Sequence, residues 1–191
     1  PDGALLVTSR SGKLWLIVPG QNKAEVAGVP RVDARGQGGL LDISVAPDFA
    51  TSRTVYFSFS QPRADGSNGT SLASAVLSVD RKKLENVNVV FPQQPAWKST
   101  LHFGSNIEWD SAGNIYLTTG ERSMPEPRQQ SQDLKSGLGK VFHIKPDGSP
   151  ADGNPFLGRT DARPEIWSYG HRNVQGAAVN PETGKLWTIE H

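Results

Sequence analysis

A short turn-and-strand pattern recurs along this chain and limits the folds it can adopt. Each copy is a tight turn containing Pro or an acidic residue, usually with Gly, and it leads into an apolar strand that ends in Thr or Ser. Short apolar strands precede three of the copies, at 41–45, 107–109 and 177–179. The copies are Pro1–Thr8, Ala46–Phe49 followed by Val55–Ser58, Asp110–Thr118 and Pro181–Thr188. Strand, turn and strand repeated in this way predict the blades of a β-propeller.

The remaining pattern is also that of an all-β protein. Apolar residues alternate with polar ones in short runs rich in β-branched and aromatic side chains, and helical periodicity is nearly absent. The chain has 20 glycines and 14 prolines, which suits many turns between short strands. An ordinary antiparallel sandwich with similar turns is the alternative fold. The predicted strands include Leu14–Val18, Thr54–Phe59, Ile115–Thr119, Val141–Ile144 and Leu186–Ile189.

The spacing of the copies exceeds the roughly 40–45 residues of a compact blade. We therefore expect loop insertions, which propellers place over the mouth of the central channel. The expected insertions are 20–36, 61–71, 92–101, 121–137 and 147–165. A propeller needs about 4–8 blades to close, and this chain holds about three. We expect residues 1–191 to be a partial propeller, truncated at both ends and inactive alone. The remaining blades would lie in the same or another chain.

Composition excludes several classes of function. The chain has 20 Lys and Arg residues against 19 Asp and Glu, so the charge balance predicts no nucleic-acid partner. It has no cysteine, which excludes disulfides, thiolate metal sites and cysteine nucleophiles. No apolar run is long enough for a membrane span. Nucleophile-elbow, zinc-protease, P-loop and Rossmann motifs are absent, and the four histidines lack metal-site spacing.

Two segments place polar residues in Gly-rich turns before strands. In Gly36–Asp42, three glycines surround Gln37, which would let the backbone approach another group closely and leave the amide free to point at it. In Leu101–Asn106, His102 stands beside Gly104 at a loop-to-strand junction. A lone histidine is more often structural, but this junction favours a functional role.

Two later segments are also candidates. Gln132–Lys140 could be a short turn that lays a strand across the channel. Glu165–Gly176 is rich in aromatic residues and contains Arg172 and Asn173. The planar guanidinium of an arginine pairs with carboxylates and stacks on rings, which suits a flat anionic ligand. A packed blade corner with a surface arginine explains this segment equally well.

Taken in order, these segments resemble the soluble PQQ-dependent aldose sugar dehydrogenases of the glucose/sorbosone dehydrogenase family. The resemblance covers essentially the whole chain, and it implies the N-terminal half of a six-bladed propeller with PQQ and calcium in the channel mouth. The matching segments are Gly36–Phe49, His102–Gly104, Ile115–Arg122, Gln132–Lys140, Asp152–Phe156, Glu165–Gly176 and Pro181–His191.

The resemblance also implies roles for individual residues. His102 would be the catalytic base that takes the proton of the sugar C1 hydroxyl as hydride passes to the quinone. Gln37 would hydrogen-bond substrate or cofactor, and Arg172 and Asn173 would lie against the quinone oxygens, Arg172 stabilising charge there. The partners would be a sugar substrate and an external electron acceptor. The location would be periplasmic or secreted, with any export signal outside this chain.

The chain departs from the family pattern at several positions. Many relatives have Arg where this chain has Asn106, and a common Pro is replaced by Val174. The glucose-oxidising branch has an Asp before the histidine, and Leu101 replaces it here. We therefore expect the broader aldose branch rather than strict glucose preference. The calcium ligands are expected after His191, and so are further cationic contacts to PQQ.

Two other functions are compatible with a propeller of this kind. One is a non-catalytic, ligand-binding propeller, because fold alone does not fix function. The other is a calcium-dependent hydrolase such as a lactonase, which would need several convergent Glu, Asp or Asn metal ligands. The presence of Gln37, His102, Arg172 and Asn173 favours the dehydrogenase.

Overall fold

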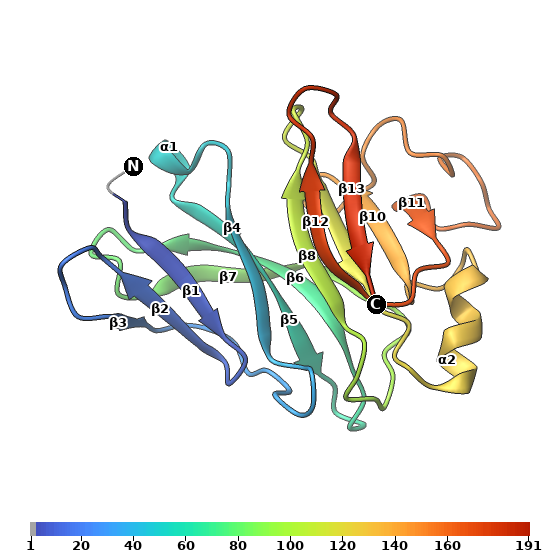
Figure 1. Cartoon of the computed structure of the whole chain (residues 1–191), viewed down its shortest axis with the longest axis horizontal. Coiled ribbons are helices and arrows are strands. Elements are labelled where there is room, and N and C mark those ends of the chain that lie inside the picture. The colour runs from blue at the N-terminus through green and yellow to red at the C-terminus, as the bar shows by residue number, and fades with distance from the viewer. Residues whose placement is uncertain (1–2) are drawn as a thin grey trace.

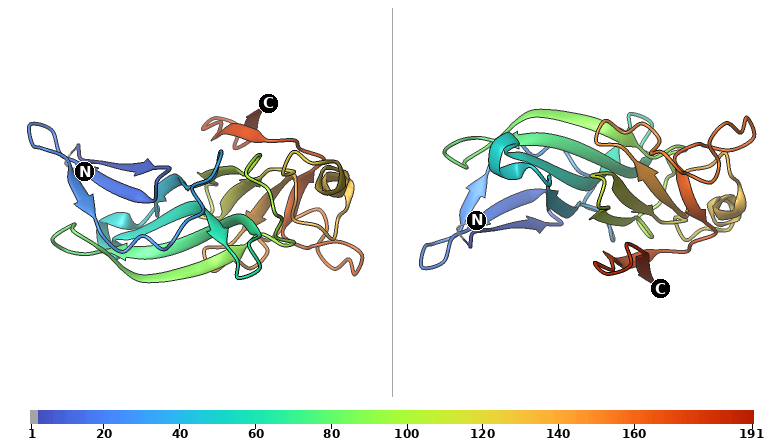
Figure 2. Two further views of the ribbon diagram at one scale, coloured as in Figure 1. Left: turned by 90° about the horizontal axis from the view of Figure 1, so that it is seen from below. Right: turned by 90° about the horizontal axis from the view of Figure 1, so that it is seen from above.

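The protein consists of antiparallel sheets that stand side by side, in a computed structural model that describes residues 3–191 (Figure 1). Strands that are consecutive in the chain are neighbours within each sheet. This meander is the topology of propeller blades, as the repeat predicts. The two views of Figure 2 show the sheets following one another from the N-terminal to the C-terminal end. Pro1 and Asp2, which open the first repeat copy, lie outside the described residues.

The first two sheets occupy the N-terminal half of the chain. The first contains β1 (Leu5–Ser9), β2 (Lys13–Ile17) and β3 (Ala24–Val26). The second contains β4 (Leu40–Val45), β5 (Thr54–Pro62), β6 (Asn68–Leu77) and β7 (Leu84–Pro92), with the helical turn α1 (Phe49–Ser52) between β4 and β5.

The other two sheets follow. The third contains β8 (Gly104–Trp109), β9 (Ile115–Thr119), β10 (Lys140–Ile144) and β11 (Ile166–Tyr169). Between β9 and β10 lie α2 (Pro125–Gln129) and the 3-10 turn η1 (Gln130–Gln132). The fourth sheet has two strands, β12 (Val174–Val179) and β13 (Leu186–Glu190).

Strand β5 shows why the sheets stack face to face. Its odd-numbered residues Val55, Phe57 and Phe59 enter the apolar core shared with the first sheet. Tyr56 enters the core shared with the third sheet. Side chains of a strand alternate between its two faces, so both faces of β5 are buried against a neighbouring sheet. This two-sided burial is the packing that propeller blades require.

Polar side chains join the sheets along their inner edge, where β4, β8 and β12 contact one another in series. The carboxylate of Asp42 on β4 accepts a hydrogen bond from the Ile107 N–H on β8 at 2.8 Å. The indole N–H of Trp109 donates to the hydroxyl of Ser44 at 2.9 Å. Burial raises the pKa of Asp42, and its bonds to backbone N–H groups oppose that shift. The first strands of consecutive blades are therefore fixed to one another by hydrogen bonds that leave few buried groups unpaired.

The five strands named above all form, with ends that differ by at most three residues. The expected insertion at 61–71 is wrong: β5 and β6 form one long hairpin, joined by residues 63–67. Its polar residues suggested a loop, but Ser60 and Thr70 lie in strands and their hydroxyls donate to backbone carbonyls. Strands β3, β6, β7 and β11 were not among the predicted strands, and β3 lies within the expected insertion 20–36.

The segment Gln132–Lys140 does not lay a strand across the channel. It is a turn that leads into β10, the third strand of its sheet. Lys140 is fully buried, and its ammonium donates to the carbonyls of Gln130, Ser131 and Leu138 at 2.7–3.0 Å. These hydrogen bonds therefore hold the turn in place against the blade that contains β10. Burial lowers the pKa of Lys140 to about 8.

Truncating the core of β5 tests the packing of the sheets. Phe57 is 1% exposed and packs against Phe59 with ring centroids 5.8 Å apart. We expect Phe57→Ala to lower the free energy of unfolding by about 3–5 kcal/mol, because it leaves a cavity between two sheets. Urea denaturation of the complete protein measures the change. Val79→Ala, at a side chain that is 86% exposed, is the control; a loss of equal size there would contradict the assignment of the core.

Candidate functional site

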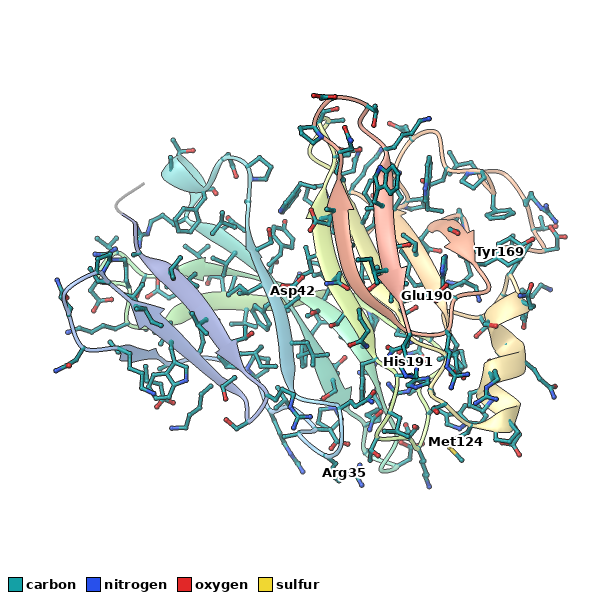
Figure 3. The ribbon with its side chains drawn as sticks, in the orientation of Figure 1. Arg35, Asp42, Met124, Tyr169, Glu190 and His191 are labelled. Atoms are coloured by element: carbon teal, nitrogen blue, oxygen red, sulfur yellow. The ribbon has the colours of Figure 1, made fainter. Side chains whose placement is uncertain are left out.

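The predicted site residues lie just before the first strands of three consecutive sheets. Gln37 precedes β4, His102 precedes β8, and Arg172 and Asn173 precede β12. These three strands contact one another in series, so the three preceding loops meet at one end of the structure. Figure 3 shows Glu190 and His191 at the end of β13, and the loop of Arg35 and that of Met124 reach the same side of the molecule.

Gln37 is bonded directly to the loop that carries His102. Its side-chain oxygen accepts a hydrogen bond from the His102 N–H at 2.8 Å, and its own N–H donates to the Thr100 carbonyl at 2.8 Å. The side-chain oxygen of Gln37 is therefore bonded to protein backbone. Its exposed NH₂ group remains available as a donor.

The glycines around Gln37 allow the chain to approach itself. A Cβ at Gly36 would lie 2.4 Å from the Thr100 carbonyl oxygen, and one at Gly39 would lie 2.0 Å from that of Arg10. Each residue also has a positive φ, of 57° and 142° respectively. The close approach expected from the sequence therefore exists, and its partner is another loop of the same chain.

His102 is buried, with 5% of its surface exposed, and its backbone is held at a φ of 49°. Its Nδ1 lies 2.5 Å from Oε1 of Glu121, a residue that is 1% exposed. A carboxylate only accepts hydrogen bonds, so Nδ1 carries the proton. In the neutral imidazole the free lone pair is then on Nε2. This arrangement gives His102 the orientation and tautomer of a general base.

Glu121 was not identified from the sequence as a site residue. Its second oxygen accepts a hydrogen bond from the Ser123 N–H at 3.0 Å and lies 3.6 Å from Nε of Arg128. The signal for it was its position: β9 is buried throughout, and the first charged residue after it is Glu121. The side chain of Leu101 cannot hydrogen-bond a histidine, and Glu121 supplies that bond from the segment that follows β9.

Arg172 and Asn173 join this cluster in different ways. Asn173 is 2% exposed, and its side-chain oxygen accepts a hydrogen bond from the Gly104 N–H at 3.0 Å, which ties the third sheet to the fourth. The carbonyl of Arg172 accepts from the Glu121 N–H at 2.9 Å. The Arg172 side chain is exposed, and no residue in 3–191 accepts a hydrogen bond from its guanidinium. The backbone of Arg172 is therefore in the site, and its guanidinium is free to bind a ligand.

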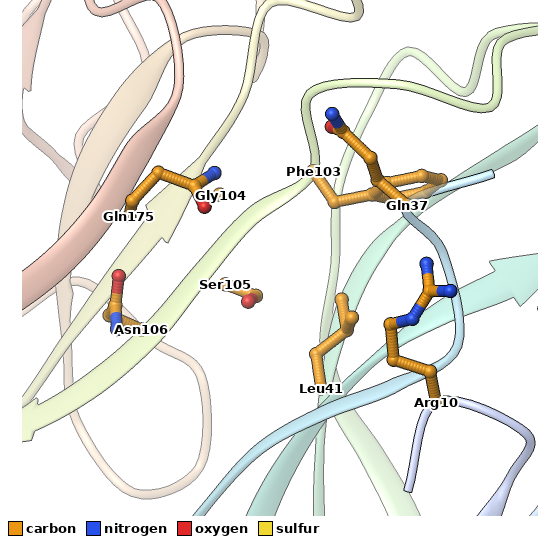
Figure 4. Close-up of a pocket in the computed structure, with 8 residues that line it drawn as sticks. All are labelled: Arg10, Gln37, Leu41, Phe103, Gly104, Ser105, Asn106 and Gln175. Carbon is orange, nitrogen blue, oxygen red and sulfur yellow. The ribbon is translucent and has the colours of Figure 1, made fainter. Parts of the chain in front are cut away.

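A cavity of about 320 Å³ opens between the inner strands beside this cluster. Figure 4 shows its polar lining, with Gln37 and Arg10 on one side and Asn106 and Gln175 on the other. The side-chain oxygen of Asn106 is buried and has no hydrogen-bond partner within residues 3–191. Buried acceptors are normally bonded, so this atom indicates a missing donor such as a ligand hydroxyl or a water molecule.

The other histidines have separate environments. His143 lies between Asp110 and Asn154, 2.9 Å from each, and stacks on Tyr116 with ring centroids 4.4 Å apart. The imidazole of His191 lies 5.9 Å from that of His102, measured between ring centroids. Residues 3–191 contain no group of three or more His, Asp or Glu side chains arranged to hold a metal ion. No helix in the described part of the chain is long and apolar enough to cross a membrane.

Comparison with known proteins identifies the class as sugar dehydrogenases. A family model described as Glucose / Sorbosone dehydrogenase matches residues 1–191, and the chain belongs to that family. The chain is 41% identical over 194 residues to aldose sugar dehydrogenase YliI of Escherichia coli strain K12, covering 100% of this chain and 51% of the relative. The chain thus spans about half the length of the relative that it matches.

Solved structures show the same relationship. A glucose dehydrogenase structure superposes with a TM-score of 0.95 at 42% identity, covering 100% of this chain and 59% of that one. The PQQ-bound form of aldose sugar dehydrogenase from Streptomyces coelicolor gives a TM-score of 0.85 at 33% identity, covering 100% and 54%. The family predicted from the sequence and the all-β propeller fold are both confirmed, and the chain covers about half of these folds.

A methyl group at Gly120 tests how the His102 loop is seated. A Cβ there would lie 2.0 Å from the His102 carbonyl oxygen, and the obstructing atoms are backbone. We expect Gly120→Ala to displace the His102 loop and lower the melting temperature by several degrees, since about 1 kcal/mol shifts Tm by about 2–8 °C. Differential scanning calorimetry measures the shift. Gly176→Ala, where no heavy atom lies within 4 Å, is the matched control and should leave Tm unchanged; equal shifts would contradict the close approach.

Proposed function

We propose that this chain forms the N-terminal part of a PQQ-dependent dehydrogenase that oxidises the C1 hydroxyl of aldose sugars to lactones. The observation that carries the proposal is the buried Glu121–His102 pair, with its 2.5 Å contact at Nδ1 and a free lone pair on Nε2. Membership of a sugar dehydrogenase family and the similarity to a PQQ-bound aldose sugar dehydrogenase support it.

His102 would act as the general base. Its Nε2 would accept the proton of the C1 hydroxyl, and the charge of the resulting imidazolium would be balanced by Glu121, whose carboxylate already holds Nδ1–H. Proton removal drives electrons from the oxygen toward C1, so that the C1–H bond breaks with loss of hydride and the lactone carbonyl forms. The two-electron acceptor for that hydride is the chemistry that PQQ supplies when bound.

The residues at the channel end fit such a group. PQQ is a flat, tricarboxylated quinone, and the guanidinium of Arg172 is exposed and without a partner in residues 3–191. The free NH₂ of Gln37 and the unpaired oxygen of Asn106 line the adjacent cavity, where they suit the hydroxyl groups of a sugar. Asn173 would contribute indirectly, since its side-chain oxygen is used to hold Gly104.

Calcium and the further partners belong to the same proposal. The described residues offer no metal-binding group, so the calcium ligands would come from residues beyond this chain. An external electron acceptor would reoxidise the quinone. A periplasmic or secreted location is part of the proposal and is tested by cell fractionation of the complete protein.

The first test is cofactor dependence. We expect the complete protein, reconstituted with PQQ and calcium, to reduce an artificial dye when aldoses are supplied, and to show no activity with NAD. A spectrophotometric dye assay over a panel of aldoses measures this. Binding of PQQ without turnover of any sugar would instead indicate a binding-only propeller. Calcium-dependent opening of lactones without dye reduction would indicate a lactonase.

The second test removes the base. We expect His102→Ala to lower kcat by about 10²–10⁴-fold while PQQ still binds, because the proton then has no positioned acceptor. Steady-state kinetics give kcat, and quenching of protein fluorescence on addition of PQQ reports binding. His143→Gln is the matched control, since His143 is also 5% exposed but lies outside the site. Near-normal turnover of His102→Ala would assign this histidine a purely structural role.

A further inference from the structure

Arg122 is the largest fully buried side chain in the described chain, and it stands one residue after Glu121. Its backbone has a φ of 73°, and the next residue, Ser123, has a φ of 60°. Left-handed backbone at two consecutive non-glycine residues is energetically costly. Burial of a guanidinium is costly as well. Arg122 thus combines an unfavourable backbone conformation with an unfavourable burial of charge, which indicates that its contacts have a specific role.

The contacts of Arg122 bracket the loop that carries His102. Its Nη2 donates to the Ser99 carbonyl at 2.7 Å, and its own carbonyl accepts from the Ser99 hydroxyl at 2.7 Å. The guanidinium lies over the ring of Phe103, 3.7 Å from its centroid. Ser99 is three residues before His102 and Phe103 is the residue after it. Arg122 therefore holds this loop on both sides of the histidine.

The charge of Arg122 is placed between two carboxylates. Its Nη2 also donates to Oδ1 of Asn68 at 2.5 Å, and the amide nitrogen of Asn68 donates to Asp33 at 2.8 Å. Hydrogen bonds from Arg35 hold the pKa of Asp33 far below its usual range, so Asp33 is ionised. Burial lowers the pKa of Arg122 to about 9, and the charges of Asp33 and Glu121 oppose that shift. At neutral pH the guanidinium is therefore a cation beside Glu121.

Stability alone is a poor explanation for this cation. Within residues 3–191, its Nε and Nη1 are buried and have no hydrogen-bond partner. Buried ion pairs are often no more stabilising than apolar residues of the same volume, and incomplete hydrogen bonding weakens them further. The contacts of Arg122 that approach the candidate site are those with Ser99 and Phe103, on either side of His102.

We propose that Arg122 is a positioning residue for the base: it seats the 99–103 loop, so that Nδ1–H of His102 remains bonded to Glu121 and Nε2 stays free. The inference rests on the proposed function of His102. It goes beyond that function by assigning the positioning of His102 to a residue that touches neither the sugar nor the cofactor.

The test compares Arg122→Met, which removes the charge at similar volume, with Arg122→Lys, which retains it. Lys140→Met is the matched control, because Lys140 is another fully buried cation of the same sheet and no contact of its ammonium reaches the His102 loop. In the apo form of the complete protein, ¹⁵N NMR of the imidazoles reports the proton on Nδ1 of His102. This readout does not depend on bound cofactor.

We expect the Nδ1–H signal of His102 to weaken or move in Arg122→Met and to persist in Arg122→Lys and Lys140→Met. In loaded enzyme, kcat of Arg122→Met should fall about 10–100-fold, as for other residues that orient a functional side chain, with KM changed less.

An unchanged Nδ1–H signal and an unchanged kcat in Arg122→Met would overturn the inference, as would equal changes in Lys140→Met. If Arg122→Met does not fold, Arg122→Lys decides: loss of the Nδ1–H signal there would also overturn the inference. Failure of the proposed function is distinguishable, because His102→Ala would then keep near-normal turnover whatever Arg122 does to the NMR signal.

Discussion

The burial of both faces of each inner sheet is the constraint on which this structure depends. On β5, Phe57 enters the core shared with the first sheet while Tyr56 enters the core shared with the third. Neither sheet can therefore rotate or slide without opening an apolar interface. Hydrogen bonds along the inner edge, such as the one from the Ile107 N–H to Asp42, fix how far one sheet is shifted along its neighbour. Together they bring three loops, each from a different sheet, to one end of the structure.

At that end the chemistry depends on close contacts between backbones. Gly36 lies against Thr100 and Gly120 lies against His102, at distances that no Cβ would permit. His102 itself has a left-handed φ of 49° and is held through its N–H by Gln37 and through its ring by Glu121. His102 is thus held by Gln37, which precedes the second sheet, on one side and by Glu121, which follows β9, on the other; such preorganisation is what the proposed general base requires.

Much of the fold could be predicted from the sequence, because turn residues and alternating apolar residues act locally. The strands around Trp15, Tyr116 and Trp187 follow directly from such patterns. The hairpin of β5 and β6 was partly missed because its serines and threonines are buried and bonded across the sheets, which no local pattern reveals. The 19-residue separation of His102 and Glu121 hides their contact for the same reason. The glycines around Gln37 were correctly taken to mark a close approach, but the sequence does not show that the approaching group is Thr100.

The position of each loop at the candidate site depends on the packing of the strand that follows the loop. Each of the three loops leads directly into a strand whose residues pack between sheets. A movement of the strand within the apolar core therefore also moves the loop. Substitutions that repack the core around Phe57 or Leu117 would shift a sheet and the loop attached to it. Such substitutions would displace His102 relative to Gln37 and Glu121 without touching any of the three residues. The relative positions of the three loops are therefore set in part by the packing of the hydrophobic interior.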